Sequence, residues 1–263
     1  MKRFKVQILS LLITNFHLTN FFGGNLYKGS LKNICSPGLN CYSCPAAIFS
    51  CPLGAIQTIS GSSRFAFSFY VTGFLLLIGL LFGRAVCGFL CPFGLIQEIF
   101  FKIKSPKFNL WHPLIYVKYF VLIIFVITFP LISKFGSPAF CEFICPAGTL
   151  EAAIPLLITH NEFFNALGEL FVLKIFILAV TLIGCIFIYR FFCKLICPLG
   201  AIYGLMNKFS LYHLHIDKKL CIDCGACKKI CRMNINPTND FNSAECIRCG
   251  DCKKICPRNA ISN

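Results

Sequence analysis

Cysteine spacing near the end of the chain is the strongest chemical signal in this sequence. Two runs share the pattern C-x2-C-x2-C-x3-C. In such a run the first three thiolates can surround one corner of an iron–sulfur cube, while the fourth points toward a neighbouring cube. A disulfide staple or a pair of zinc sites is the alternative, but zinc ribbons space their cysteine pairs differently. The spacing therefore favours two [4Fe–4S] clusters. The cysteines are Cys221, Cys224, Cys227 and Cys231 in the first run, and Cys246, Cys249, Cys252 and Cys256 in the second.

These two runs resemble the bacterial-type two-cluster ferredoxin domain. In that family the ligation is crossed, because the fourth cysteine of each run binds the other cluster. Arg232 stands where the first run usually carries proline, so the turn after Cys231 departs from the family pattern. The resemblance implies one cluster on Cys221, Cys224, Cys227 and Cys256, and a second on Cys231, Cys246, Cys249 and Cys252.

A second cysteine pattern, C-P-x-G, occurs four times before these runs. The segments RAVCGFLCPFGLI from Arg84 and RFFCKLICPLGAI from Arg190 match along their length, and FCEFICPAG from Phe140 shares the C-x3-C-P core. This recurrence predicts a duplicated unit. C-x3-C places two thiols about one helical turn apart. The proline can start a new segment without an amide donor, and the glycine allows close backbone approach. The four copies begin at Cys51, Cys91, Cys145 and Cys197.

Paired thiols in these copies predict a metal or redox role beside the membrane. Four thiolates from two similar loops suffice for one tetrahedral metal ion or one [4Fe–4S] cluster. The first candidate set is Cys87, Cys91, Cys193 and Cys197. A lone buried cysteine such as Cys185 is expected to act as a small hydrophobe. A second set of cysteines is expected on the opposite face of the membrane. Three roles remain open for this set: a cluster or metal site, disulfides, or a thiol–disulfide redox site. The residues concerned are Cys41, Cys44, Cys51, Cys141 and Cys145, with Cys35 in the same segment.

Composition indicates a chain that lies largely in lipid. Hydrophobic residues make up 57% of the sequence and charged residues 13%, and the mean hydropathy is +0.74. The net charge of +15 does not indicate nucleic-acid binding, because Lys and Arg are spread along loops rather than gathered on one face. Nineteen cysteines, eight of them in motifs that need free thiolates, indicate a reducing compartment for the C-terminal domain. No cleavage site is evident near the start, so the first segment is expected to be a retained helix.

Apolar runs predict four transmembrane helices. The first run is at the lower limit of roughly 17–25 residues that a span requires. Lys and Arg cluster before the first run and after the second and fourth, which places both termini and the 84–112 loop in the cytoplasm. We therefore expect an α-helical membrane bundle with internal duplication in residues 1–212, followed by a small α+β two-cluster ferredoxin domain in residues 213–263. The expected spans are about 6–22, 65–83, 113–133 and 168–189.

The order of these features is similar to the NapH/MauN type of membrane ferredoxin and to the membrane core of the NosR-type polyferredoxins. The resemblance covers essentially the whole chain and rests on the C-x3-C-P motifs after the second and fourth spans and on the eight C-terminal cysteines. It implies electron transfer between a quinone pool, or a soluble reductant, and a partner enzyme. The chain departs from these families in its additional C-P-x-G copies at Cys51 and Cys145, and in lacking the flavin-binding domain of the NosR type.

Three functions are compatible with these patterns. The leading hypothesis is a membrane-anchored iron–sulfur electron carrier in the cell membrane. The others are a redox-sensing or metalloenzyme-assembly factor, and a transmembrane thiol–disulfide relay using Cys141 and Cys145. Since no general base or nucleophile constellation is evident, the chain is expected to be an electron-transfer subunit rather than a stand-alone enzyme. A hydrocarbon core about 30 Å thick is too wide for one electron hop, so conduction across it would need an intermediate carrier.

Overall fold

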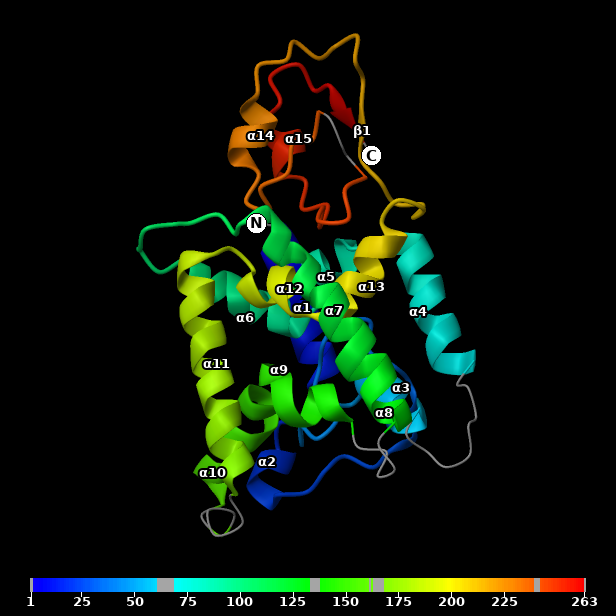
Figure 1. Cartoon of the computed structure of the whole chain (residues 1–263), viewed down its shortest axis with the longest axis vertical. Coiled ribbons are helices and arrows are strands. Elements are labelled where there is room, and N and C mark those ends of the chain that lie inside the picture. The colour runs from blue at the N-terminus through cyan, green and yellow to red at the C-terminus, as the bar shows by residue number, and fades with distance from the viewer. Residues whose placement is uncertain are drawn as a thin grey trace.

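The computed structural model describes residues 2–60, 69–132, 138–160, 162, 168–238 and 242–262. Figure 1 shows an elongated molecule in which a small C-terminal unit lies at one end of a helical body. The first residues of the chain lie near that same end, and a layer of short helices separates the C-terminal unit from the longer ones.

The duplication expected from the C-x3-C-P motifs appears as two similar trios of helices. One trio is α4 (Phe69–Phe82), α5 (Ala85–Phe89) and α6 (Pro92–Phe101). The other is α11 (Glu169–Phe187), α12 (Phe191–Leu195) and α13 (Pro198–Met206). In each trio the last helix begins with the proline of C-P-x-G, where the missing amide hydrogen costs nothing. The last helix of each trio packs on the long helix of the other trio: α6 packs on α11, and α13 packs on α4.

A second layer of helices lies at the end of the body away from the C-terminal unit. The chain enters through α1 (Lys2–Thr14), α2 (Asn20–Gly23) and the short η1 (Ser30–Asn33), and then forms α3 (Pro52–Ser60). A later stretch forms η4 (Phe140–Ile144), α9 (Pro146–Gly148), η5 (Thr149–Ala153) and α10 (Ile154–Thr159). Here α3 and α9 are the helices that start at the remaining two C-P-x-G prolines.

Within the described residues, two helices are long and apolar enough to cross a membrane. One is Glu169–Phe187 and the other is His112–Ile132, which is continuous through η2 (His112–Tyr116), α7 (Val117–Val121), η3 (Leu122–Thr128) and α8 (Phe129–Ile132). They correspond to the third and fourth expected spans. Within the most apolar 18 residues of each helix, only 22% are buried in His112–Ile132 and only 17% in Glu169–Phe187. Side chains such as Val172 and Phe176 are exposed, as expected of helices surrounded by lipid.

The first expected span is interrupted, and the second lies partly outside the described residues. Residues 65–68 are not described, and the described helix α4, of 14 residues, lies within the expected range 65–83. The expected helix over 6–22 is wrong as a single element, because α1 ends at Thr14 and α2 starts at Asn20. Side chains of Thr14 and Asn15 bond to backbone carbonyls of the preceding turn, and the His17 amide bonds instead to the Ala46 carbonyl. These polar contacts end the helix.

The C-terminal unit combines two short helices with a two-stranded antiparallel sheet. The helices are α14 (Ala226–Ile230) and α15 (Asp251–Ile255), and β1 (His215–Ile216) pairs with β2 (Ile261–Ser262). Its two halves repeat the same backbone conformation. Left-handed residues occur at equivalent positions of the two cysteine runs, namely Asp223 and Arg248, Gly225 and Gly250, and Asn234 and Asn259. The two runs are therefore folded as copies of one another.

Candidate functional site: three layers of cysteines

The eight C-terminal cysteines surround two separate cavities. One cavity is lined by Cys221, Cys224, Cys227 and Cys256, and the other by Cys231, Cys246, Cys249 and Cys252. This is the grouping that crossed ligation requires, although ligation itself stays a prediction. We call the first set the distal group and the second the proximal group. Cys224 of the distal group is exposed, whereas Cys231 and Cys249 pack against the core of the helical body.

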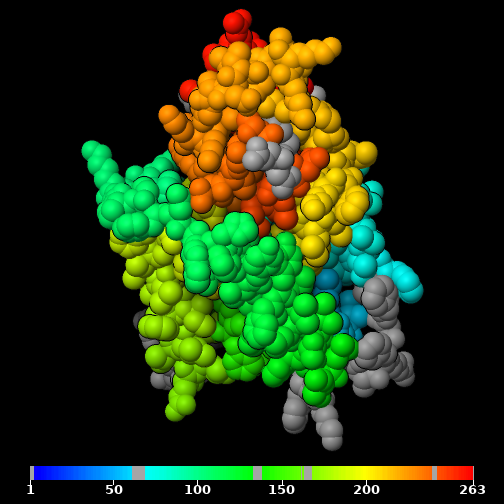
Figure 2. Space-filling view, turned by 45° about the horizontal axis from the view of Figure 1, so that its top comes forward, coloured from blue at the N-terminus to red at the C-terminus, as the bar shows by residue number. Residues whose placement is uncertain are grey.

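The proximal group is attached to the helical body through the residues beside Cys246. Ile247 is buried, and a Cβ atom placed on Gly88 of α5 would lie 2.7 Å from the Ile247 carbonyl oxygen. The Asn207 side chain donates to the Ser243 carbonyl at 2.7 Å and to the Cys246 carbonyl at 3.0 Å. Figure 2 shows the orange and red C-terminal residues packed directly against the green middle of the chain. Lys118 of α7 also forms an ion pair with Glu245 of the C-terminal unit. The two units therefore share one interior.

Four buried thiols lie directly beneath this junction, and we call them the upper group. They come from the short helices that follow each long helix. Cys91 and Cys197 occupy the residue before the first proline of α6 and α13, and the Gly200 amide donates to Cys197 Sγ at 3.4 Å. Their exposed fractions do not exceed 5%, so water is excluded from the sulfurs. The members are Cys87, Cys91, Cys193 and Cys197.

Two arginines lock the two trios together reciprocally. Arg84 precedes α5 and donates from Nη2 to the carbonyl of Cys193 at 3.0 Å, in the other trio. Arg190 precedes α12 and donates from Nη1 to the carbonyl of Cys87. Both side chains are fully buried. Each arginine also meets a buried glutamate, Arg84 with Glu245 at 2.6 Å and Arg190 with Glu98. The burial cost of both cations is thereby offset by carboxylates and carbonyls.

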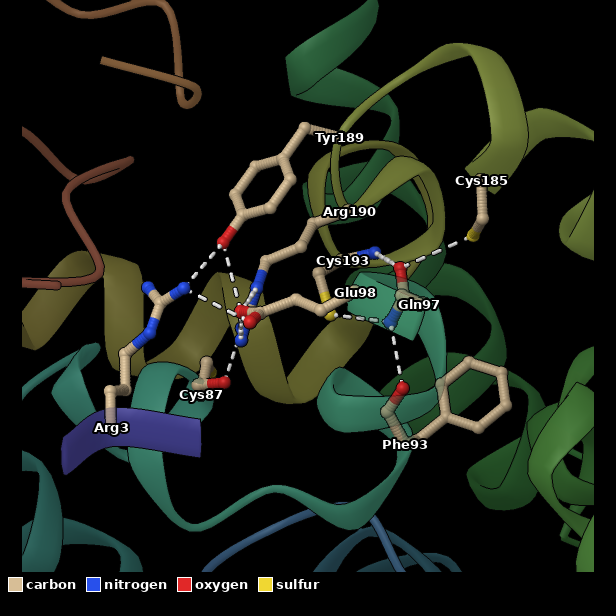
Figure 3. Close-up of polar contacts among 9 residues, drawn as sticks. All are labelled: Arg3, Cys87, Phe93, Gln97, Glu98, Cys185, Tyr189, Arg190 and Cys193. Atoms are coloured by element: carbon tan, nitrogen blue, oxygen red, sulfur yellow. Dashed lines mark hydrogen bonds and ion pairs between the residues drawn. The ribbon is translucent and has the colours of Figure 1, made fainter. Parts of the chain in front are cut away.

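Figure 3 shows the half of this network that contains Arg190. Glu98 accepts hydrogen bonds from Tyr189 at 2.8 Å and from Arg3 at 3.0 Å, in addition to those from Arg190. Burial opposes ionisation of Glu98, but the positive charges of Arg190 and Arg3 outweigh it and hold the carboxyl pKa below its ordinary value. The N-terminal residues are thus tied to the same layer.

Gln97, on the same helix as Glu98, contacts the upper group directly. Its Nε2 donates to Cys193 Sγ at 3.0 Å, as Figure 3 shows. The hydrogen bond from Cys197, and then Arg190 and Gln97, lower the pKa of the Cys193 thiol against the opposing effect of burial. The surroundings therefore favour a thiolate, the form that binds metals.

Apart from Cys185 in α11, the remaining cysteines lie in the second layer of helices. Cys41, Cys51, Cys141 and Cys145 line one cavity of about 560 Å³, together with Cys35. Cys44 does not line it and contacts Asn15 instead, with its sulfur 3.9 Å from Oδ1. The structure therefore brings together four of the five cysteines predicted for this face. We call Cys41, Cys51, Cys141 and Cys145 the lower group.

None of the nineteen cysteines, all within the described residues, is in a disulfide. Across the same described ranges, no three or more His, Cys, Asp or Glu side chains are arranged around a single metal ion. A cubane cluster fits the donor sets better than one ion, because its four irons each take one thiolate and hold the sulfurs farther apart. The all-cysteine composition and the amide donors to sulfur suit such a cluster.

Sequence reasoning missed the polar side chains that surround these thiols. A signal was present, because a polar residue stands six positions after the cysteine of every C-P-x-G copy: Gln57, Gln97, Glu151 and Tyr203. Two of these residues, Gln57 and Gln97, make the same kind of contact with a cysteine sulfur. Gln57 donates to Cys141 Sγ at 3.3 Å, as Gln97 does to Cys193. Arg84 and Arg190 could be seen in the matched sequence segments, but the sequence did not show that each arginine bonds to a carbonyl of the other copy.

Comparisons with known proteins agree with this arrangement. A family model described as a 4Fe-4S binding domain matches residues 64–110, 118–154 and 170–219, more than half of the chain. A second model with the same description matches residues 240–262. No solved structure is significantly similar to the chain.

Several curated proteins are related to this chain. The putative electron transport protein YccM of Escherichia coli is 28% identical over 61% of the chain and 44% of its own length. The methylamine utilization ferredoxin-type protein MauN of Methylorubrum extorquens is 28% identical over 60% of the chain and 50% of its own length. The regulatory protein NosR of Stutzerimonas stutzeri is 31% identical over 63% of the chain and 22% of its own length. The chain thus spans half or less of these relatives.

The matched residues include three of the four C-P-x-G copies and the second cysteine run. The resemblance to MauN-type and NosR-type ferredoxin proteins is therefore confirmed, and the chain belongs to the 4Fe-4S binding domain family.

Proposed function

We propose that this chain is a membrane-anchored iron–sulfur electron carrier that links a quinone pool or a soluble reductant to a partner redox enzyme. The distal and proximal groups would each hold one [4Fe–4S] cluster, and the upper group would hold a third. Such clusters supply one-electron redox chemistry, with potentials set by burial and hydrogen bonds to sulfur. The names of YccM and MauN, which refer to electron transport and to a ferredoxin type, support this reading.

The position of Arg84 is the observation that carries the proposal. Its guanidinium donates at 3.0 Å to the carbonyl of Cys193 in the upper group. It also donates at 2.6 Å to the carbonyl of Ala244, two residues before Cys246 of the proximal group. One rigid, fully buried side chain thus spans the boundary between the two sets of thiols. The exposed Cys224 side of the distal group is the natural contact for a soluble partner.

A membrane location is supported by the two helices of spanning length and their exposed apolar side chains. We assign the C-terminal domain and both termini to the cytoplasmic side. Arg3, Arg84 and Arg190 gather in the layer beside that domain, as the positive-inside rule requires of a cytoplasmic end. We propose the same domain boundary as the sequence suggests, between residues 212 and 213.

The decisive experiment removes one cysteine from each copy in the upper group. In the Cys91→Ala/Cys197→Ala double variant, anaerobically purified protein should lose about four irons, one cubane. Electron delivery to an acceptor should stop, while the electron paramagnetic resonance (EPR) signals of the C-terminal clusters remain. Cys185→Ala is the matched control, because Cys185 is also buried but belongs to no group. It should keep full iron content and activity.

Full electron delivery in the double variant would contradict a carrier role for the upper group. Reduction of the clusters by a quinol, followed by stopped-flow absorbance, tests the quinone link separately. Clusters that are present but show no turnover with either a quinol or a reduced soluble ferredoxin would favour the redox-sensing or assembly role instead.

A further inference from the structure

The lower group has the same local construction as the upper group. Cys51 and Cys145 each precede the proline that starts a helix, α3 and α9. A glycine stands three residues after each of these cysteines, at Gly54 and Gly148, in the position of Gly200, whose amide donates to Cys197 Sγ. The Gln57 contact with Cys141 repeats the Gln97 contact with Cys193. Two distant parts of the chain thus build one more site of the same kind.

The fourth thiol of this site comes from outside the C-x3-C pattern. Ala47 stands four residues before Cys51, where the other copies have cysteine. Cys41 replaces it, because a Cβ atom placed on Gly148 would lie 3.4 Å from Cys41 Sγ. Cys44 packs instead with Ala46 and Ala47. The ligand set is therefore Cys41, Cys51, Cys141 and Cys145.

Unpartnered polar atoms around the cavity point to a ligand inside it. Asn40 lines the cavity and is fully buried, yet neither Nδ2 nor Oδ1 has a hydrogen-bond partner within the described residues. An amide buried without hydrogen-bond partners destabilises the folded state. The cluster's sulfides accept hydrogen bonds, so Nδ2 would find its partner there.

The segment that contains Gly38, Leu39 and Asn40 lies between the upper and lower groups. Leu39 and Asn40 line the cavity of the lower group, and Leu39 is packed in one buried core cluster with Cys91 and Cys51. The preceding Gly38 packs so closely that a Cβ atom would lie 2.7 Å from Cys91 Cα. Tyr203 of α13 donates to the Pro37 carbonyl at 2.9 Å and holds this segment in the interior.

We propose that the lower group binds a further [4Fe–4S] cluster, and that the Leu39–Asn40 peptide couples it to the upper group. This rests on the proposed function, which supplies the upper cluster. Two centres stacked along the body provide the intermediate carrier that a membrane about 30 Å thick demands. One electron would pass from the reduced cluster to the oxidised one, with the thiolates of each group serving as ligands.

Iron and acid-labile sulfide measured on the anaerobically purified full chain test the proposal. The wild type should contain about sixteen irons, four cubanes. Cys145→Ser should lose about four irons while the EPR signals of the C-terminal clusters persist. Cys44→Ser is the matched control in the same segment and should lose none. Equal iron in Cys145→Ser and wild type would overturn the proposal, as would an equal loss in Cys44→Ser.

The Asn40→Leu variant covers the case in which Cys145→Ser does not fold. Loss of the amide donor should make the midpoint potential of one EPR signal more negative in a redox titration, and leave the other signals unchanged. An unchanged titration would count against a cluster beside Asn40. Thiol alkylation with mass spectrometry identifies the remaining alternative, because two disulfides in the lower group would exclude a cluster there.

Failure of this inference differs from failure of the proposed function. If Cys197→Ser loses about four irons and Cys145→Ser loses none, only the upper group binds a cluster. If the wild type contains about eight irons and neither variant changes them, neither the upper nor the lower group binds a cluster, and the redox chemistry is confined to the C-terminal clusters.

Discussion

Arg84 donates from Nη2 to the backbone carbonyl of Cys193. Cys193 lies in the other copy of the repeat, 106 residues after Cys87, the matching cysteine in the copy that contains Arg84. Arg190 in turn donates from Nη1 to the backbone carbonyl of Cys87. This exchange explains why a duplicated sequence folds into one body rather than two. Arg190 finds its carboxylate partner, Glu98, in the other copy, whereas Arg84 pairs with Glu245 of the C-terminal unit.

Arg84→Met should destabilise the protein strongly. Glu245 would lose one of its two cationic partners in the interior, and removing one member of a buried ion pair costs about 3–5 kcal/mol. Thermal unfolding in detergent under anaerobic conditions measures the loss. Lys254→Ala is the matched control, because its pair with Asp251 is exposed and should contribute about 0–1 kcal/mol. A similar melting temperature for both variants would contradict this account.

Glycine in the C-P-x-G motif is required by packing between the copies. A Cβ atom on Gly94 would lie 2.9 Å from the Cys87 carbonyl oxygen and 3.2 Å from Arg190 Nη1. Gly94→Ala should therefore displace the Arg190 contact and lower the iron content of the upper group. Gly73→Ala, in α4, is the control, since nothing lies within 4 Å of its Cβ position. It should leave iron unchanged and shift stability by no more than about 1 kcal/mol.

Gln97→Leu should make the potential of the cluster held by the upper group more negative. The variant removes the hydrogen bond from Nε2 to Cys193 Sγ, and hydrogen bonds to sulfur raise the potential of a cluster. A redox titration followed by EPR should show one shifted signal and unchanged C-terminal signals. Gln57→Leu should shift a different signal, because Gln57 contacts Cys141. If both variants shift the same signal, the two groups are not separate centres.

Stability should fall in acid through Glu98. Its folded-state pKa lies below the ordinary value, so its contribution is complete above the unfolded-state pKa of about 4.3 and is lost as the pH falls through the folded-state pKa. Melting temperatures between pH 7 and pH 3 measure this dependence, with the C-terminal and upper clusters monitored by absorbance. Glu98→Gln should be less stable at pH 7 and should show a flatter dependence. An unchanged slope in this variant would assign the acid sensitivity to other groups.

The sequence by itself determined what depends on short spacing and composition. The two C-terminal cysteine runs, the four C-P-x-G copies and the two longest apolar helices were all predicted, because ligand spacing and helix length are local properties. The resemblance to a family rested on the same motifs. The helix over 6–22 was not predicted correctly, since its break depends on contacts with residues around Ala46.

Tertiary structure alone decided which thiols form the lower group. Cys41 and Cys44 look equivalent in the sequence, yet only Cys41 reaches the cavity that Cys145 lines. The exchange of Arg84 and Arg190 and the pairing of Gln57 with Cys141 also join residues that are far apart in the chain. Such contacts depend on how whole helices pack, and a hydrophobic or cysteine pattern does not specify the partner of a helix. The sequence therefore determines which thiols are present, and the packing of the helices determines which of them lie around one cavity.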